Sequence, residues 1–556
     1  MNVRIFGPPG TGKTYALTQT IGHLLGRHDA TDYLSQYDLD LPHGKYSYRD
    51  IVFMSHTNSA VDELLGRVGI ARGYRSGLFG TMHGIALHLL IDTGAVSRSI
   101  VNKTIGRPGA VGWWKMKFAR EVGIPYDPNE EYTTMLGNQF FQAYSKAVHV
   151  YFPQYLNLQR VIDKLAEEDD QFGTLAEDWI RFKKREKIFD FDDILALALM
   201  AEVHPERPVL VADEFQDFSP LQWEIFKDWM VDTDWVIVAG DDDQCIYLYS
   251  GASPRFILHE FPADHSAVLK RSFRLPSKIL TLSRHLVEFF VRNRYPKSFA
   301  PRGDGGKLVL QDINLSALPR SAYLLASKGI SVMILARTNS QVRAIEESFL
   351  NAGVPYYRFK TRRMQIWKDF VDRVEELVNL LRKGKAPAKQ DLRFYFRLAG
   401  LDGPPLDRAV KATIENPRNL LVQKILQDPV SIIKIDRLAE VLGSEAAAEL
   451  AKEALRARLS GKLVKPAAPI HIDTIHAAKG READVVIIYD SITPRIQNEL
   501  EAGTPEDFEA EVRVWYVAMT RARWGLVISR GPMPFLTPKL AQIHYLLRRK
   551  ALARRG

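Results

Sequence analysis

The feature that most constrains the fold lies near the N-terminus, in the stretch "VRIFGPPGTGKTYALTQ". Residues 3–6 read as a short buried strand, residues 14–25 carry helix-forming residues, and the segment between fits G-x-x-x-x-G-K-[ST]. Its glycines allow backbone N–H groups to close around phosphates at a helix N-terminus. We expect Lys13 to reach the β- and γ-phosphates and the Thr14 hydroxyl to bind Mg²⁺. The full set of expected nucleotide-binding loop residues is Gly7, Pro8, Pro9, Gly10, Thr11, Gly12, Lys13 and Thr14.

Composition narrows the class of protein, because the loop alone leaves kinases, GTPases, transporters and motors open. The 556 residues suggest about four domains, and 46% hydrophobic residues allow sizeable cores. The longest apolar runs fall far short of the ~20 residues of a membrane span, and no apolar signal region precedes the loop. A single cysteine, Cys245, excludes internal disulfides and fits a cytoplasmic location. The net charge of +9 hints at a polyanionic partner without deciding the matter.

Short apolar runs followed by polar clusters recur near residues 50, 208, 235, 332 and 483. Such runs are typical of parallel strands buried on both faces, with ligands gathered beyond their carboxyl ends. Two long stretches lack these runs and have helical patterning. We therefore predict an α/β fold of two parallel-sheet cores, each with a mainly helical insertion. The predicted boundaries are 1–87 and 190–268 for the first core, 88–189 for its insertion, 269–365 and 466–556 for the second core, and 366–465 for its insertion.

Paired acids follow one of the predicted strands. In "LVADEFQD", one carboxylate of Asp213 and Glu214 is suited to the Mg²⁺ shell and the other to polarising the attacking water. An isolated Asp-Glu pair usually marks a solvated turn, but the strand before it and the upstream loop favour catalysis. In the stretch "VAGDDDQCIYLYSGA", polar residues again directly follow a predicted strand, and Gln244 among them is placed to sense the γ-phosphate. We interpret residues 241–243 as a loop that is simply acidic.

Two arginines complete the set of candidate catalytic residues. Arg274 lies beside Phe273 in "LKRSFRLP", and Arg521 lies in "YVAMTRAR", just before a predicted strand. A motor with ATP between two cores needs cationic side chains at the γ-phosphate, and such a finger contributes ~10³–10⁵ in rate. A surface charge is the commoner explanation of any single arginine, so the interpretation depends on the ordered set.

That ordered set resembles the UvrD/Rep/PcrA family of superfamily 1 DNA helicases from residue 3 to about residue 530. The loop corresponds to motif I, "SHTNSAVDELLGRV" to Ia, "GTMHGIALHLL" to Ib, "VADEFQDFSPLQ" to II and "GDDDQCIYLYSGA" to III. "LKRSFRLPSKIL" corresponds to IV, "ILARTNSQVRAIEESFLNAGVPY" to IVa, "DTIHAAKGREADVVII" to V and "YVAMTRAR" to VI. Each motif is moderately specific, whereas nine in family order are highly specific.

The resemblance implies two RecA-like P-loop NTPase cores that use ATP and Mg²⁺. The implied catalytic residues are Glu214 as general base with Asp213, Lys13, Gln244, Arg274 and Arg521. Thr14 and Asp213 would hold the metal, and Phe273 and Glu482 would contact the nucleotide. Tyr249 occupies the place of a base-stacking aromatic. The implied DNA contacts are Thr57, Asn58, Thr81, His83, Tyr249, Arg337, Asn339, Thr474 and His476.

The function implied by the resemblance is an ATP-dependent DNA helicase that translocates 3′→5′ on single-stranded DNA and unwinds duplex. Single strands and single-strand/duplex junctions are the expected partners, with no membrane involvement. One alternative is a translocase that strips proteins from single strands with little unwinding. Another is a DNA-binding subunit of a larger complex with weak or lost catalysis, against which the intact catalytic set argues.

The sequence also departs from the family pattern. His56 replaces the usual Phe of motif Ia, Ser250 stands where an Arg is common in motif III, and the second insertion is shorter than in relatives. Relatives carry a segment before motif I whose glutamine reads adenine, and residues 1–6 leave no room for it. We therefore expect unusually broad use of nucleoside triphosphates. Because the chain stops soon after motif VI, we expect no fused nuclease.

Overall fold

A computed structural model of the chain describes residues 1–30, 33–56, 58–69, 78–105, 109–128, 135–312, 314–352, 354–359, 362–442, 445–460 and 466–553. The chain forms two compact units. The first unit comprises Met1–Gly305 and Glu499–Thr520, and the second comprises Gly306–Asn498 and Arg521–Gly556. These units and the predicted domains divide the chain at different residues, and the predicted domain boundaries stay predictions.

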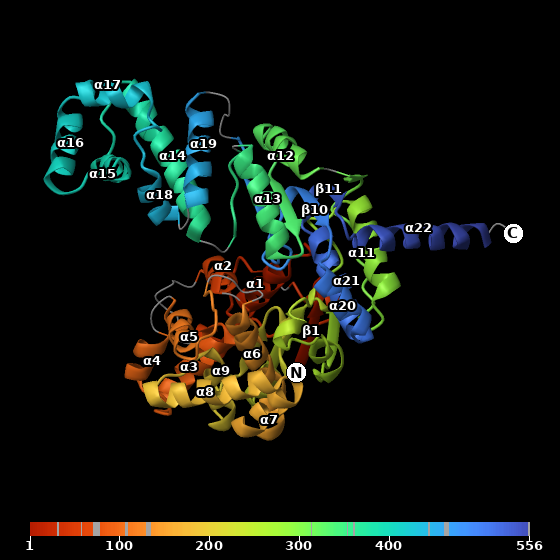
Figure 1. Ribbon diagram of the computed structural model, residues 1–556. Helices are drawn as coiled ribbons and strands as arrows, with labels where there is room; N and C mark the ends of the chain where they lie inside the picture. The colour runs from red at the N-terminus through yellow and green to blue at the C-terminus, as the bar shows by residue number, and fades with distance from the viewer. Residues whose placement is uncertain are drawn as a thin grey trace. The chain divides into compact units, whose positions relative to one another are not determined.

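A six-stranded parallel sheet forms the centre of the first unit (Figure 1). Its strands are β1 (Asn2–Phe6), β2 (Ile51–Met54), β3 (Phe79–Gly80), β4 (Val209–Ala212), β5 (Trp235–Gly240) and β6 (His265–Val268), in the order β3-β2-β4-β5-β1-β6. Residues of β2 and β4 are buried throughout, as expected for strands covered on both faces. Because β1 pairs with β5, the loop after β1 lies beside the carboxyl end of β5.

Helices surround this sheet, and the segment between β3 and β4 has helices joined by loops, with no strand among its described residues. The sheet is accompanied by α1 (Lys13–Leu24), α2 (Asn58–Val68), α10 (Pro220–Trp229), α11 (Ser277–Phe290) and α21 (Pro505–Met519). The helical segment comprises α3 (Met82–Asp92), α4 (Arg98–Thr104), α5 (Ala110–Glu121), α6 (Leu136–Tyr155), α7 (Leu158–Glu168), α8 (Asp170–Glu186) and α9 (Phe191–Met200). Trp179 lies in the hydrophobic core of this helical segment, and its ring centroid is 5.1 Å from that of Phe118 and 5.2 Å from that of Phe141.

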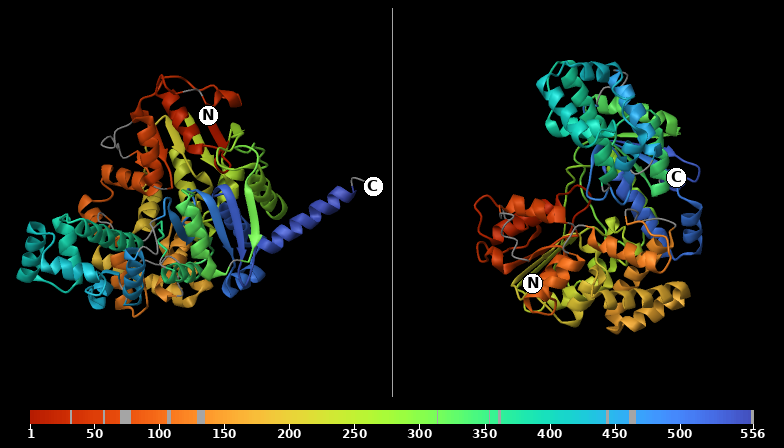
Figure 2. Two further views of the ribbon diagram at one scale, coloured as in Figure 1. Left: turned by 90° about the horizontal axis from the view of Figure 1, so that it is seen from above. Right: turned by 60° about the vertical axis from the view of Figure 1, so that its left-hand side comes forward.

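A five-stranded parallel sheet forms the centre of the second unit. Its strands are β7 (Lys307–Gln311), β8 (Val332–Ala336), β9 (Ile470–Thr474), β10 (Ala483–Asp490) and β11 (Ala522–Arg530), in the order β7-β11-β10-β8-β9. Figure 2 (left) shows the blue strands of this sheet beside the green strand β7. The helices α12 (Leu318–Ser327) and α13 (Asn339–Asn351) pack on it around Ile334 and Val342.

A group of helices between α13 and β9 has a hydrophobic core of its own, which includes Phe370, Tyr395 and Leu438. The helices are α14 (Arg362–Arg382), α15 (Lys389–Leu398), α16 (Gly403–Glu415), α17 (Leu420–Gln427), α18 (Ile435–Leu442) and α19 (Glu445–Leu459), and α20 (Pro494–Ala502) and α22 (Leu536–Ala553) occur later in the chain. The predicted fold class is therefore confirmed: two parallel α/β cores, each interrupted by helices. None of the described helices has the length and apolar character needed to cross a membrane.

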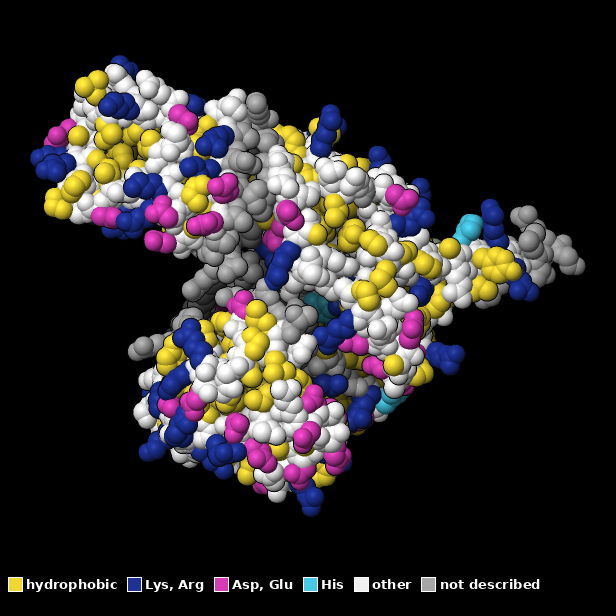
Figure 3. All heavy atoms as spheres, in the orientation of Figure 1, with side chains coloured by type: hydrophobic (Ala, Val, Ile, Leu, Met, Phe, Trp, Pro, Cys, Tyr) yellow, Lys and Arg dark blue, Asp and Glu magenta, His cyan; other side chains and the backbone are white. Residues whose placement is uncertain are grey.

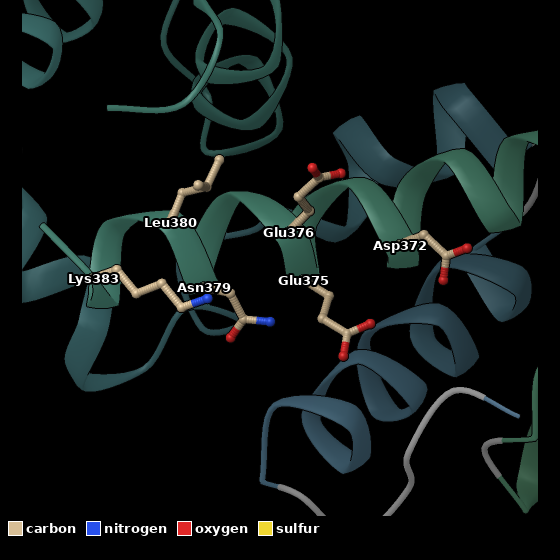
Figure 4. Close-up of a pocket in the computed structure, with 6 residues that line it drawn as sticks. All are labelled: Asp372, Glu375, Glu376, Asn379, Leu380 and Lys383. Atoms are coloured by element: carbon tan, nitrogen blue, oxygen red, sulfur yellow. The ribbon is translucent and has the colours of Figure 1, made fainter. Parts of the chain in front are cut away.

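The helix α14 carries a hollow on its surface. A hollow of about 380 Å³ along it is lined by Asp372, Glu375, Glu376, Asn379, Leu380 and Lys383 (Figure 4). Arg458 of α19 forms ion pairs with Asp372 at 3.1 Å and Glu375 at 2.6 Å. Arg458 and Lys383 therefore offset most of the charge of the three carboxylates that line this hollow.

Candidate nucleotide and nucleic-acid sites

The loop between β1 and α1 has the conformation of a phosphate cradle. Gly10 (φ 71°) and Gly12 (φ 80°) adopt left-handed backbone conformations that favour glycine. A Cβ at Gly7 would lie 1.8 Å from the Lys13 Cγ, so the lysine side chain folds back over the loop. The loop is closed by the Thr11 N–H and hydroxyl, which both donate to the carbonyl of Pro8, at 3.1 Å and 2.7 Å.

Two carboxylates of the segment after β4 face this loop. Glu214 lies 3.0 Å from the Lys13 Nζ, and the Thr14 hydroxyl donates to Asp213 Oδ2 at 3.5 Å. Burial and the neighbouring Glu214 raise the pKa of Asp213 to about 7. Burial lowers the pKa of Lys13, but attraction to Glu214 and Asp213 outweighs it and raises that pKa above its usual value. Glu214 itself has φ 55°, a left-handed conformation of the kind found at functional sites.

The donor set of Thr14 and Asp213 fits Mg²⁺. A hydroxyl and a carboxylate supply the hard oxygen ligands that Mg²⁺ prefers, and the ion commonly takes its remaining ligands from water and substrate phosphates. Among the described residues, no group of three or more His, Cys, Asp or Glu side chains gathers as a metal site. Thr14 and Asp213 would therefore supply part of the Mg²⁺ coordination shell, and water and a bound nucleotide would supply the rest.

A hydrogen-bond relay connects Glu214 with Gln244. The Gln216 amide donates to Glu214 Oε2 at 2.7 Å, and its oxygen accepts from the Asp241 N–H at 2.9 Å. The Asp241 carboxylate accepts from the Gln244 amide at 2.7 Å. Gln216 is fully buried, which fixes the relay in a water-poor environment. The sequence suggested roles for Glu214 and Gln244 but missed the two residues that join them.

The acidic loop of residues 241–243 is not solvent-exposed, and our interpretation of it as simply acidic is wrong. Asp241, Asp242 and Asp243 are all fully buried. The Lys297 ammonium pairs with all three, at 2.9 Å from Asp241 and Asp243. Arg294 adds two hydrogen bonds to Asp243, at 3.0 Å and 2.6 Å. Lys297 lies 54 residues beyond Asp243 and outside any recognised motif, so no sequence signal pointed to it.

The residues of motif IV touch the phosphate loop directly. The Phe273 N–H donates to the Gly10 carbonyl at 2.7 Å, while its ring is 62% exposed and available for stacking. A Cβ at Gly10 would lie 2.4 Å from the Arg274 Cβ. The Arg274 Nη1 donates to the Thr520 carbonyl at 3.3 Å. Phe273 and Arg274 therefore belong to the same compact unit as the phosphate loop.

The other two predicted nucleotide contacts belong to the second unit. Arg521 is buried, and its carbonyl accepts from the Ala483 N–H at 3.1 Å. Glu482 lies just before β10, 3.7 Å from the Arg523 Nη1. Their roles at the nucleotide stay predictions.

Two of the DNA-binding residues predicted in the first unit, Thr81 and His83, lie just after β3. Thr81 caps α3, its hydroxyl accepting from the Gly84 N–H at 3.2 Å. The ring of His83, in α3, lies 6.4 Å from His149, and burial lowers its pKa to about 4, so it is neutral near pH 7. Thr57 and the side chain of Asn58 lie outside the described residues.

An aromatic group lies at the same edge of the sheet. His56 and Tyr247 stack at 5.3 Å with an interplanar angle of 17°, and Tyr249 meets Tyr247 edge-on at 6.0 Å. Tyr249 is half-buried, so it combines support from neighbours with an accessible ring. His56, noted only as a departure from the family, thus takes an aromatic role here.

The four DNA-binding residues predicted in the second unit follow neighbouring strands. Ala336 of β8 pairs with Thr474 of β9, which brings together the segments that hold Arg337 and His476. Asn339 begins α13, and its side-chain oxygen accepts from Arg358 at 3.2 Å. The structure therefore gathers these side chains at one sheet edge.

Comparison with known proteins agrees with this geometry. The family described as UvrD/REP helicase N-terminal domain matches residues 1–264, and the UvrD-like helicase C-terminal domain matches residues 423–531. ATP-dependent DNA helicase UvrD2 of Mycobacterium tuberculosis (strain ATCC 25618 / H37Rv) is 27% identical over 62% of this chain and 51% of the relative. ATP-dependent DNA helicase PcrA of Staphylococcus epidermidis (strain ATCC 12228 / FDA PCI 1200) is 21% identical over 95% and 81%. DNA helicase II of Escherichia coli (strain K12) is 23% identical over 64% and 49%.

The chain spans about half the length of the mycobacterial and Escherichia coli relatives that it matches. The two family matches together cover more than half of the chain, and both correspond to helicase cores. The chain belongs to the UvrD/PcrA-like superfamily 1 helicases.

Proposed function

We propose that this protein is an ATP-dependent DNA motor that translocates 3′→5′ on single-stranded DNA and unwinds duplex at single-strand/duplex junctions. The observation that supports this most strongly is the convergence of the phosphate loop with Asp213 and Glu214, and of Glu214 with Gln244 through the relay. The direction of movement rests on the family. ATP is the proposed fuel and Mg²⁺ the proposed metal.

The side chains of the first unit suit phosphoryl transfer to water. Lys13 would contact the β- and γ-phosphates, while Thr14 and Asp213 would hold Mg²⁺, which neutralises phosphate charge. Glu214 would accept the proton of the attacking water. Because Glu214 now pairs with Lys13 at 3.0 Å, bound phosphates would compete for Lys13 and free the carboxylate. Arg274, beside the loop, would stabilise charge in the transition state.

The proposed DNA path combines aromatic stacking with contacts to phosphates. Tyr249 would stack on a base, an interaction of about 1–3 kcal/mol that tolerates any sequence. Figure 3 shows Lys and Arg side chains over the surface of the first unit. Arg98 and Lys103 of α4 and Arg120 of α5 are exposed on its helical part. They are candidates for phosphate contacts that would make affinity salt-dependent.

A second candidate function is a translocase that displaces proteins with little unwinding. The second insertion, which is shorter than in relatives, favours it. A strand-displacement assay beside a streptavidin-displacement assay on biotinylated single strands separates the two functions. Efficient removal of streptavidin without strand displacement would favour the translocase. DNA-stimulated ATP hydrolysis near background would instead favour a catalytically weak DNA-binding subunit.

A further inference from the structure

The buried cation Lys297 lies against the loop that carries the proposed γ-phosphate sensor. We propose that Lys297 is a positioning residue for ATP hydrolysis: its ammonium group fixes the Asp241 carboxylate, and Asp241 in turn orients the Gln244 side chain. The inference rests on the proposed function, because it assigns Lys297 a part in the turnover of the same site. The ion pairs of Lys297 are with Asp241, Asp242 and Asp243, so it acts on the phosphate site through Asp241.

Asp241 is the residue through which both halves of the relay pass. Its N–H donates to the Gln216 oxygen at 2.9 Å, and its Oδ2 accepts from the Gln244 amide at 2.7 Å. Its other carboxylate oxygen, Oδ1, faces the Lys297 Nζ at 2.9 Å. Together with the Asp243 N–H, which donates to the same oxygen at 3.4 Å, the ammonium group therefore fixes the plane of the carboxylate that holds Gln244. A rotated carboxylate would remove this acceptor from the Gln244 amide and weaken its orientation toward the phosphate.

Charge makes Lys297 difficult to replace. The side chains of Asp241, Asp242 and Asp243 are almost completely shielded from water, and buried carboxylates require cationic or hydrogen-bonding partners. Arg294 forms two hydrogen bonds with Asp243 and so neutralises that carboxylate. Lys297 is the cation that pairs directly with Asp241.

The segment that carries Lys297 is itself fixed at several points within the first unit. The Arg292 N–H donates to Glu509 at 2.8 Å, and Arg513 donates to the Asn293 carbonyl at 2.7 Å, both from α21. The Tyr295 ring stacks on Phe6 at 4.0 Å, directly before the phosphate loop. Lys297 thus projects from a segment held to α21 and to β1, which makes it a rigid support for Asp241.

Two variants of Lys297 separate its effect on the position of Gln244 from its effect on the balance of buried charge. Lys297→Met leaves three buried carboxylates with less compensation and is expected to lower the melting temperature. Lys297→Met/Asp242→Asn removes one cation and one anion together, so it is expected to recover most of that temperature. The double variant is nevertheless expected to lower kcat for DNA-stimulated ATP hydrolysis by about 10- to 100-fold, the usual cost of losing a supporting group behind a catalytic one. Affinity for a fluorescent ATP analogue should stay within about threefold, because the phosphate loop is untouched.

The substitution Gln244→Ala distinguishes a role of Lys297 in positioning Gln244 from a purely structural role. If Lys297 acts through Gln244, adding Gln244→Ala to the double variant should lower kcat no further than Gln244→Ala alone. Lys227→Met, at an exposed ion pair of 2.7 Å with Glu224, is the matched control and should retain wild-type kcat. Wild-type kcat in the folded double variant, or additive losses with Gln244→Ala, would overturn the inference. Absence of DNA-stimulated hydrolysis in the wild type would instead overturn the proposed function.

Discussion

The Lys13 ammonium lies 3.0 Å from the Glu214 carboxylate, so the phosphate-binding lysine and the proposed general base form an ion pair. The Gln216 amide holds the second oxygen of the same carboxylate. These contacts place Glu214 beside the phosphate loop, although its backbone adopts the left-handed conformation. The arrangement makes separable predictions for binding and for hydrolysis.

Glu214→Gln should abolish most hydrolysis while preserving nucleotide binding. The amide has nearly the same shape but cannot accept the proton of the attacking water, and loss of a general base costs about 10²–10⁴ in rate. Removal of the carboxylate also frees Lys13 for phosphate, so affinity for ATP should be equal or higher. Single-turnover hydrolysis and binding of a fluorescent ATP analogue measure the two effects, with Glu224→Gln as the exposed control. Turnover within tenfold of wild type would exclude Glu214 as the base.

Lys183→Met should destabilise the helical part of the first unit. Lys183 is buried between Asp190 at 3.3 Å and Asp193 at 2.7 Å, and its removal leaves both carboxylates without their cation. Breaking such a pair costs about 3–5 kcal/mol. The neighbouring Lys184 is exposed, and Lys184→Met should change the unfolding free energy by less than about 0.5 kcal/mol. Urea unfolding measures both; equal effects at the two positions would contradict this account.

Acid should destabilise the first unit partly through His83. Burial and the nearby His149 lower its pKa from 6.5 to about 4 in the folded protein. The unfolded chain takes up this proton near pH 6.5 and the folded chain only near pH 4, so stability is lost as pH falls through that window. Since the ring is partly exposed, we expect about 2 kcal/mol from this group.

His83→Gln should therefore flatten the decline of the unfolding free energy between pH 6.5 and pH 4. The variant cannot take up the proton in either state, whereas other groups contribute as before. His544→Gln, at an exposed position of α22, serves as the control and should follow the wild-type curve. Identical pH curves for His83→Gln and wild type would show that His83 titrates normally in the fold.

Tyr249→Ala should weaken binding to single-stranded DNA of any sequence. The ring is supported edge-on by Tyr247 at 6.0 Å, and loss of one stacked base costs about 1–3 kcal/mol. Fluorescence anisotropy with a labelled oligonucleotide measures the change in Kd, which should rise about 5- to 150-fold. Tyr155→Ala, which removes a 40% exposed ring on α6, should leave the Kd unchanged. An unchanged Kd for Tyr249→Ala would assign Tyr249 to packing alone.

The sequence predicted those parts of the molecule that depend on local pattern. Apolar runs identified the strands β2, β4, β5, β8 and β10, and the phosphate loop was predicted from its own residues because glycine positions and a helix start are local features. The carboxylates of Asp213 and Glu214 followed from their place after a strand. These features require no knowledge of distant contacts.

The rest depended on contacts between distant segments. The burial of residues 241–243 becomes visible only when Lys297 is placed against them, and charge alone makes such a run resemble a solvated loop. Gln216 joins Asp241 across two strands, a relation that spacing does not encode. The stack of His56 on Tyr247 likewise depends on the neighbouring edges of the sheet.

The central claim is that ATP hydrolysis at Glu214 drives 3′→5′ movement along DNA. Unwinding of 3′-tailed and 5′-tailed duplexes by wild type and Glu214→Gln, in the presence of ATP and Mg²⁺, tests it most directly. The wild type is expected to unwind only the 3′-tailed duplex, and Glu214→Gln is expected to unwind neither duplex while still binding the tail. Unwinding from the 5′ tail alone, or undiminished unwinding by Glu214→Gln, would contradict it.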